Sequence, residues 1–264
     1  MFDYVSQKQY RNPCSIWTLA FVLMMAWSTS GFTKGDIVAS ASDLKFALDE
    51  VHSQFQAEYR QSVKLVYGSS GLLYQQIVNG APFGMLLSAD EQYPIQLDKA
   101  GLAPNAGELY AIGRIVLLQR RDSTITLSVN KNELLELIRN AKKIAIANPQ
   151  HAPYGRAAKE FLVSLGAWEL AYPKLVYGEN ITQASSFVLA GGADFGISAL
   201  SLALAPVIAK QSRYVLISDE HHGILKQRMV LTKHATPTVT QFYEYLRTPA
   251  ARNILSRYGF TLPK

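Results

Sequence analysis

The sequence predicts an α/β protein of two lobes, each a mixed, mostly parallel sheet flanked by helices. Short apolar runs of strand length alternate with amphipathic segments of helical length, and this alternation is typical of parallel sheets. An internal repeat indicates two lobes of similar construction, because Lys64-Leu-Val-Tyr-Gly68 recurs as Lys174-Leu-Val-Tyr-Gly178. Each copy leads through a tight turn into a helix, and we expect Ser70 and Asn180 to cap those two helices.

Eight apolar runs are expected to form strands, at residues 37–39, 64–67, 85–87, 115–118, 143–147, 174–177, 195–198 and 214–217. Two of the intervening segments carry apolar residues at the spacing i, i+3, i+4 and i+7, which marks one face of a helix. These faces consist of Leu44, Ala47, Leu48, Val51 and Phe55 in the first segment, and of Ala158, Phe161, Leu162 and Leu165 in the second. We expect both faces in the core, without a chemical role.

The N-terminus has the layout of a secretory signal peptide over residues 1–30. Lys8 and Arg11 precede an uncharged apolar run at residues 16–27, and small residues follow it. At about 12 residues the run is shorter than the ~20 needed to span a bilayer. An uncleaved anchor stays open as an alternative, because Trp27 lies near the expected cut and no A-x-A triplet is present. The only cysteine, Cys14, precedes the apolar run, which argues against lipid attachment after cleavage.

The charge of the mature chain is mildly positive. Without residues 1–30 the chain has 24 basic and 19 acidic side chains, a net charge of +5. The basic residues are scattered, and they form no stripe interleaved with aromatic residues of the kind that nucleic-acid-binding proteins use. We therefore expect no nucleic-acid partner. No later stretch approaches 18 uninterrupted apolar residues, so we expect the mature protein to be soluble. We also expect it to be a periplasmic monomer.

Polar residues gather where expected strands end and helices begin, the place where open α/β sheets bind ligands. Four such junctions stand out: Ala41-Ser42-Asp43, Gly68-Ser69-Ser70-Gly71, Pro153-Tyr154-Gly155 and Glu179-Asn180-Ile181. Helix N-termini offer unpaired N–H groups and a partial positive charge, so several that converge can bind an anion. A serine before a helix is more often an ordinary N-cap, and only the set of four favours an anion site between the lobes.

At these junctions the sequence resembles the molybdate-binding proteins of ABC transporters, and the resemblance covers nearly all of the mature chain. The motifs are ASASDLKFAL (39–48), YGSSGLLYQQIVNGAP (67–82), SAD (88–90), IANPQHAPYGRAAKEFLVSLGAW (146–168), KLVYGENITQA (174–184) and FYEYLRTPAARNILSRYGF (242–260). The PxHxPxGxxAKE-like stretch, the SSG turn and the YGF ending together are highly specific.

The resemblance implies a type II periplasmic-binding-protein fold and a division of the chain into lobes. Lobe 1 would comprise residues 31–113 plus 227–264, and lobe 2 residues 114–226. The protein would capture molybdate or tungstate and deliver it to an ABC-type membrane permease, without a cofactor, so that molybdenum or tungsten enters only as the oxyanion. The implied donors are the hydroxyls of Ser42 and Ser70 and the backbone N–H groups of Tyr154 and Ile181.

The chain departs from the family pattern in three places. The acidic residue that usually follows Ala-Pro-x is Gly84 here. A tyrosine that commonly donates its hydroxyl to the ligand is replaced by Ala199, which leaves Tyr154 or a water to fill the gap. Gln227-Arg228 stands where relatives have Tyr-Pro at the return crossing. These departures leave open another oxyanion, such as sulfate or a phosphate-like anion.

A secreted hydrolase is the competing function, and the catalytic motifs argue against it. The sequence contains no G-x-S-x-G elbow, H-E-x-x-H pair or G-x-x-x-x-G-K-[ST] loop. No spacing supports Ser70 with His151 as nucleophile and base. Adjacent histidines such as His221 and His222 point in different directions on most backbones, so we expect them in a loop near the hinge and not on a metal.

We expect the exported protein to begin near Gly31, because the charged and then apolar N-terminus is recognised and cleaved as a signal. N-terminal sequencing of the extracytoplasmic protein measures this directly. An intact Met1 in the membrane fraction would instead establish the anchor.

Overall fold

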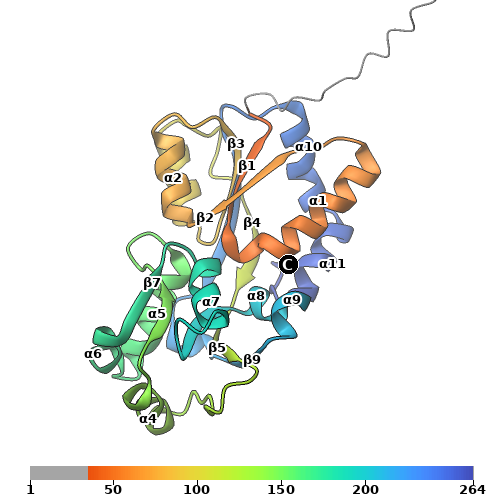
Figure 1. The fold of residues 1–264 in the computed structure, drawn as a ribbon. Helices are drawn as coiled ribbons and strands as arrows, with labels where there is room; N and C mark the ends of the chain where they lie inside the picture. The colour runs from red at the N-terminus through yellow and green to blue at the C-terminus, as the bar shows by residue number, and fades with distance from the viewer. Residues whose placement is uncertain (1–34, 264) are drawn as a thin grey trace, which may run out of the picture. The chain divides into compact units, whose positions relative to one another are not determined.

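The computed structural model describes residues 35–263, so the expected signal peptide lies outside the described residues. The described chain forms two five-stranded sheets (Figure 1). The first sheet has the order β2-β1-β3-β10-β4, with β1 (Ile37–Ala41), β2 (Lys64–Gly68), β3 (Phe83–Ser88), β4 (Glu108–Gly113) and β10 (Leu225–Leu231). The second has the order β7-β6-β8-β5-β9, with β5 (Ile115–Arg120), β6 (Ile144–Ala147), β7 (Leu175–Gly178), β8 (Phe195–Ala199) and β9 (Ser212–Leu216).

The two sheets share one topology. In each, a central strand pairs in parallel with two neighbours: β1 with β2 and β3, and β6 with β7 and β8. The next strand, β10 in the first sheet and β5 in the second, runs antiparallel to both of its neighbours. The repeated Lys-Leu-Val-Tyr-Gly segments supply the equivalent edge strands β2 and β7. The predicted two-lobed α/β fold is therefore confirmed. We call the first sheet with its helices the first lobe, and the second sheet with its helices the second lobe.

Helices cover both faces of the sheets. The longer helices are α1 (Lys45–Tyr59), α2 (Ser70–Val78), α3 (Gln92–Lys99), α4 (Lys131–Asn140), α5 (Pro153–Ser164), α7 (Ile181–Leu189), α10 (Pro237–Leu246) and α11 (Pro249–Arg257). The shorter ones are α6 (Trp168–Ala171), α8 (Leu200–Leu204) and α9 (Pro206–Ala209), with the 3-10 turns η1 (Ser42–Leu44), η2 (Tyr172–Lys174) and η3 (Asp219–His221). None of the helices within residues 35–263 has both the length and the apolar character to cross a membrane.

Alternate residues of the first sheet enter two separate apolar clusters. Val38 and Met229 pack on the side of α1, α10 and α11, whereas Ala39 and Val230 pack on the side of α2 and α3 (Figure 1). Successive strand residues point to opposite faces, so a sheet covered on both sides reads as a continuous apolar run. Both expected helix faces are buried, as predicted. The first, in α1 and its preceding turn, joins the cluster on the side of α10 and α11, whereas the second, along α5, joins the core of the second lobe.

All eight expected strands form, with ends shifted by at most two residues. β4 and β10 were not predicted from the sequence, and the two strands are adjacent in the first sheet. In β10 the polar run Lys226-Gln227-Arg228 interrupts the apolar pattern, although Gln227 is fully buried. β4 ends at Gly113 and β5 begins at Ile115, so the chain passes there from one sheet to the other. It returns ahead of Leu225, which pairs with Gly113. The lobe boundaries at 113 and 227 stay a prediction.

Candidate functional site

The four predicted junctions meet around one hollow. Ser42 follows β1, Ser70 follows β2, Tyr154 lies in the first turn of α5 after β6, and Ile181 begins α7 after β7. Because β1 and β2 are parallel, as are β6 and β7, each pair of helix N-termini lies at the same sheet edge. The described residues that line this hollow are Ala41, Ser42, Asp43, Gly68, Ser69, Ser70, Ala89, Ala152, Pro153, Tyr154 and Ile181.

The size of the hollow limits what it can hold. Its volume is about 10 Å³, close to the ~10 to 15 Å³ that a cavity needs to hold one water molecule. Pockets for drug-sized ligands usually measure ~300 to 1,000 Å³. With the lobes in this arrangement the hollow is nearly filled, and it has no room for a sugar or a peptide.

Ser42 touches both lobes. Its Oγ donates a hydrogen bond to Asn180 Oδ1 at 3.1 Å and accepts one from the Thr182 amide at 3.4 Å. Thr182 Oγ1 donates to the Ser42 carbonyl at 2.8 Å. Asn180 caps α7 as predicted, since its Oδ1 accepts from the Gln183 amide. Ser42 itself caps no helix with its side chain, so its hydroxyl can exchange Asn180 for a ligand.

The cap of α2 is Ser69, and the expectation of Ser70 in this role was wrong. Ser69 Oγ accepts from the Leu72 amide, whereas Ser70 is the first residue of the helix itself. Ser70 is fully buried, and its Oγ accepts from the Ala89 amide at 2.9 Å. A hydroxyl that accepts one bond still has its proton to donate, and this proton lies in the wall of the hollow.

Tyr154 and Ile181 bring backbone amides to the same place. Tyr154 is the second residue of α5 and Ile181 the first residue of α7. Amides in the first turn of an α-helix have no partner within the helix and carry the positive end of its dipole. Both residues are buried, so a ligand in the hollow would meet these amides largely shielded from water.

A buried carboxyl, that of Asp43, lies directly behind the serine. Its side chain is 1% exposed, and its Oδ2 accepts from the Tyr154 hydroxyl at 2.9 Å and from Gln227 Nε2 at 2.7 Å. Its Oδ1 has no hydrogen-bond partner among the described residues. Burial raises the pKa of Asp43 to about 6, against the opposing effect of the Gln227 and Tyr154 hydrogen bonds. Tyr154 therefore contributes its amide at the hollow and its hydroxyl to Asp43, and the hydroxyl does not fill the place of the missing tyrosine.

Asp43 was predicted only as a member of the first junction, and Gln227 and Tyr110 were not predicted as parts of the site. Tyr110 Oη donates to Gln227 Oε1 at 2.7 Å, which fixes the orientation of the Gln227 amide toward Asp43. One signal was present in the sequence, an acidic residue next to an expected anion ligand, which is out of place unless it has partners in a buried network. Gln227 gave no such signal, because it lies in the polar run Lys226-Gln227-Arg228.

Further hydrogen bonds join the lobes around the hollow. The Gly71 amide donates to the His151 carbonyl at 2.9 Å, and Ser69 Oγ lies 2.8 Å from His151 Nδ1. Thus His151 pairs with Ser69, which also caps α2, and not with Ser70. Burial lowers the pKa of His151, so its ring is neutral at neutral pH. Arg156 forms an ion pair with Asp90 across the same seam.

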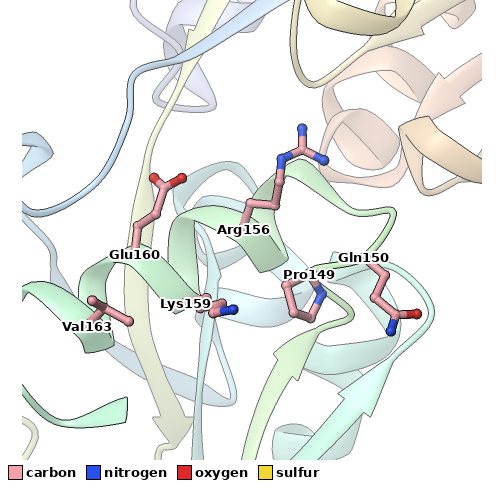
Figure 2. A pocket seen from close by; sticks show the side chains of 6 residues that line it. All are labelled: Pro149, Gln150, Arg156, Lys159, Glu160 and Val163. Atoms are coloured by element: carbon pink, nitrogen blue, oxygen red, sulfur yellow. The ribbon is translucent and has the colours of Figure 1, made fainter.

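A larger hollow of about 440 Å³ lies on the outer face of α5 (Figure 2). Four of its residues, Arg156, Lys159, Glu160 and Val163, have the i, i+3, i+4, i+7 spacing of one helix face. Val163 is 53% exposed, so this is the solvent face of α5, and a small anion there would remain hydrated. The smaller hollow is the better candidate site.

The structure gives no support to a metal centre. Among residues 35–263 no three His, Cys, Asp or Glu side chains gather closely enough to bind a metal ion. His221 and His222 lie in and after η3, ahead of the return strand β10. Their rings face different partners, Ser164 Oγ for His221 and the Gly223 carbonyl for His222.

Ala199 lies in the core. It ends β8, is fully buried, and packs in the apolar cluster that contains Ala41, Ile115 and Ile181. It is not one of the residues that line the hollow. The side chain of Ala199 is therefore part of the core of the second lobe.

Fold and site together define a two-lobed solute-binding protein. The model of the family "Bacterial extracellular solute-binding protein" matches residues 37–261, and the chain belongs to this family. It is 33% identical to the molybdate-binding protein ModA of Azotobacter vinelandii over 229 residues, which cover 85% of this chain and 89% of that protein. The ModA protein of Escherichia coli K12 is 32% identical over 233 residues, 85% of this chain and 88% of that protein.

A solved structure gives the same assignment. The periplasmic molybdate-binding protein of Azotobacter vinelandii superimposes with a TM-score of 0.76 at 31% identity, covering 86% of this chain and 99% of that one. The chain is thus a solute-binding protein and not an enzyme. Proteins of this kind bind a ligand and carry no cofactor.

Restoring a tyrosine with Ala199→Tyr is expected to destabilise the protein by about 1 to 3 kcal/mol, because it overpacks a closed core. Denaturant melts measure the effect, and Ala190→Tyr at an exposed position of the second lobe is the matched control. If Ala199→Tyr kept the stability of the parent protein and tightened ligand binding, the cleft would have retained room for the hydroxyl.

Proposed function

We propose that this protein captures molybdate or tungstate in the hollow between its lobes and delivers it to an ABC-type membrane permease. The observation that carries the proposal is the convergence of four strand-to-helix junctions on one small hollow. The names of the relatives support the choice of ligand, since the ModA proteins that share about a third of its residues are molybdate-binding proteins.

The proposed ligands are the hydroxyls of Ser42 and Ser70 and the amides of Tyr154 and Ile181. All four are neutral donors. A tetrahedral oxyanion has acceptors in all directions, so donors from both lobes can reach it only when the lobes meet around it. No Lys or Arg is among the described residues that line the hollow, and an anion without a fixed counter-charge leaves when the lobes separate.

The lobes are proposed to move as residues 31–113 with 227–264, and as residues 114–226. The two connections at Gly113 and near Gln227 would then be the hinge. Residues 1–30 are proposed to direct export to the periplasm, where the mature protein acts as a monomer without nucleic-acid partners. The mild and scattered positive charge supports the expectation that nucleic acid is not a partner.

A ligand panel tests the choice of oxyanion. With molybdate or tungstate at about 100 times Kd, the folded state gains about 2.7 kcal/mol, so thermal unfolding shifts upward. Sulfate, phosphate and citrate serve as comparison ligands. A larger shift of thermal unfolding with sulfate or phosphate would show that this anion, and not molybdate, is the ligand. A panel without any shift would contradict the proposed function.

The serine ligands are tested by removing each hydroxyl. Ser42→Ala and Ser70→Ala are each expected to weaken molybdate binding about ten- to a hundred-fold, because a hydrogen bond to a charged group contributes roughly 1.5 to 3 kcal/mol. Calorimetry measures the affinity, and denaturant melts measure the stability. For Ser70→Ala we also expect a loss of about 1 kcal/mol in stability, because the Ala89 amide loses its partner.

The matched control is Ser53→Ala on the exposed face of α1, where the hydroxyl bonds only the carbonyl of Asp49. This variant should bind as the parent protein does. Parent-like affinity in both Ser42→Ala and Ser70→Ala would refute the site assignment, whatever their stability.

A further inference from the structure

Asp43 places an acid in the wall of an anion site. It lines the same hollow as the four proposed ligands, its side chain is 1% exposed, and one of its two oxygens has no partner among the described residues. The other oxygen already accepts two hydrogen bonds, from Tyr154 and Gln227. Burial outweighs these two hydrogen bonds and the smaller effects of the Asp43 and Leu44 backbone amides, all of which favour the ionised form. A carboxyl with one proton needs fewer donors than a carboxylate, so this buried place favours the protonated form.

Within residues 35–263, no lysine, arginine or histidine shifts the pKa of this carboxyl. The titratable groups that act on it are the hydroxyls of Tyr154 from α5 and Tyr110 from β4, and burial keeps the pKa of both well above the usual range, so both are neutral. The helices α7 and α8, which pack against the turn that carries Asp43, contain no titratable residue.

The charged side chains on the remaining elements are engaged elsewhere. Lys45 of α1 pairs with Asp49. Arg156 of α5 pairs with Asp90, while Lys226 and Arg228 of β10 both pair with Glu91. An oxyanion in the hollow would therefore add a like charge beside a buried carboxylate that has no counter-ion.

We propose that the site binds its oxyanion together with one proton, which the free Oδ1 of Asp43 takes up. This inference rests on the proposed function and names the charge state in which the site accepts its ligand. The proton removes the repulsion between carboxylate and dianion at the place where the lobes meet. Asp43 is thus a residue that sets the conditions of binding through its charge, and the hydrogen bonds to Tyr154 and Gln227 remain.

The sign of the pH dependence follows from the raised pKa of Asp43, about 6. Below about pH 6 the carboxyl already holds its proton, and affinity is independent of pH. Above about pH 6 the Asp43 carboxyl is ionised in the free protein, and it must take up a proton when the anion binds. The affinity then falls about tenfold for each pH unit, up to the pKa of Asp43 in the complex, which is higher than in the free protein. Molybdate itself stays a dianion over this pH range, so the slope of affinity against pH reports the titration of a group of the protein.

Calorimetry of the parent protein with molybdate tests the inference without any variant. In two buffers of different ionisation enthalpy at about pH 7.5, we expect uptake approaching one proton per molybdate bound. The affinity should fall by up to about a hundred-fold between about pH 6 and pH 8. Binding without proton uptake would overturn the inference and leave the proposed function intact, whereas absence of binding at both pH values would overturn both.

Asp43→Asn locates the proton. An asparagine keeps an oxygen for Tyr154 and Gln227 and is neutral at every pH, so affinity should become independent of pH, near the low-pH value of the parent protein. Asp122→Asn, at a carboxylate that is 72% exposed, is the matched control and should keep the full slope. Proton uptake that persists in Asp43→Asn would place the proton on another group and refute the assignment.

Discussion

The hydrogen bond from the Tyr154 hydroxyl to the Asp43 carboxyl is the contact on which the site depends. It joins the first turn of α5 in one lobe to the first turn after β1 in the other. Gln227 donates to both partners and is itself held by Tyr110. The network leaves no spare space, because a Cβ at Gly113 would come within 2.3 Å of the Tyr154 hydroxyl oxygen. A glycine is therefore required at the point where the chain crosses between the sheets.

The same network determines where the ligand-binding amides lie. Tyr154 is buried over its whole length, so the position of its ring fixes the position of its amide at the hollow. Apart from the Arg156–Asp90 ion pair, the hydrogen bonds described here across the seam are either between neutral groups or made to Asp43, whose charge depends on pH. Neutral hydrogen bonds contribute only about 0.5 to 1.5 kcal/mol each. Apolar contacts cross the seam as well, since Ala41 and Ala89 of the first lobe pack in the same cluster as Ile181 of the second.

Much of this could be predicted from the sequence, for identifiable reasons. Strands buried on both faces, such as β1 and β3, read as apolar runs, and the helix faces of α1 and α5 keep a regular spacing. The strands β4 and β10 were missed because their polar residues serve the buried network where the chain crosses between the sheets. Gln227 is buried there with hydrogen-bond partners that no local pattern reveals. The neighbouring serines Ser69 and Ser70 could not be told apart from the sequence. A shift of the helix start by one residue exchanges their roles as helix cap and as proposed ligand.

The combination of a buried acid with neutral donors also accounts for the lack of lysine and arginine around the hollow. A fixed cation there would pair with Asp43, lower its pKa and keep it ionised at every physiological pH. The cation would then be neutralised before any oxyanion arrived, and the ligand would have to compete with a carboxylate for it. With neutral donors, the carboxyl can give up its charge by taking a proton, and the first-turn amides and serine hydroxyls stay available to the anion. Under the proposed proton uptake, affinity and release would be governed by how closely the lobes meet and by one proton.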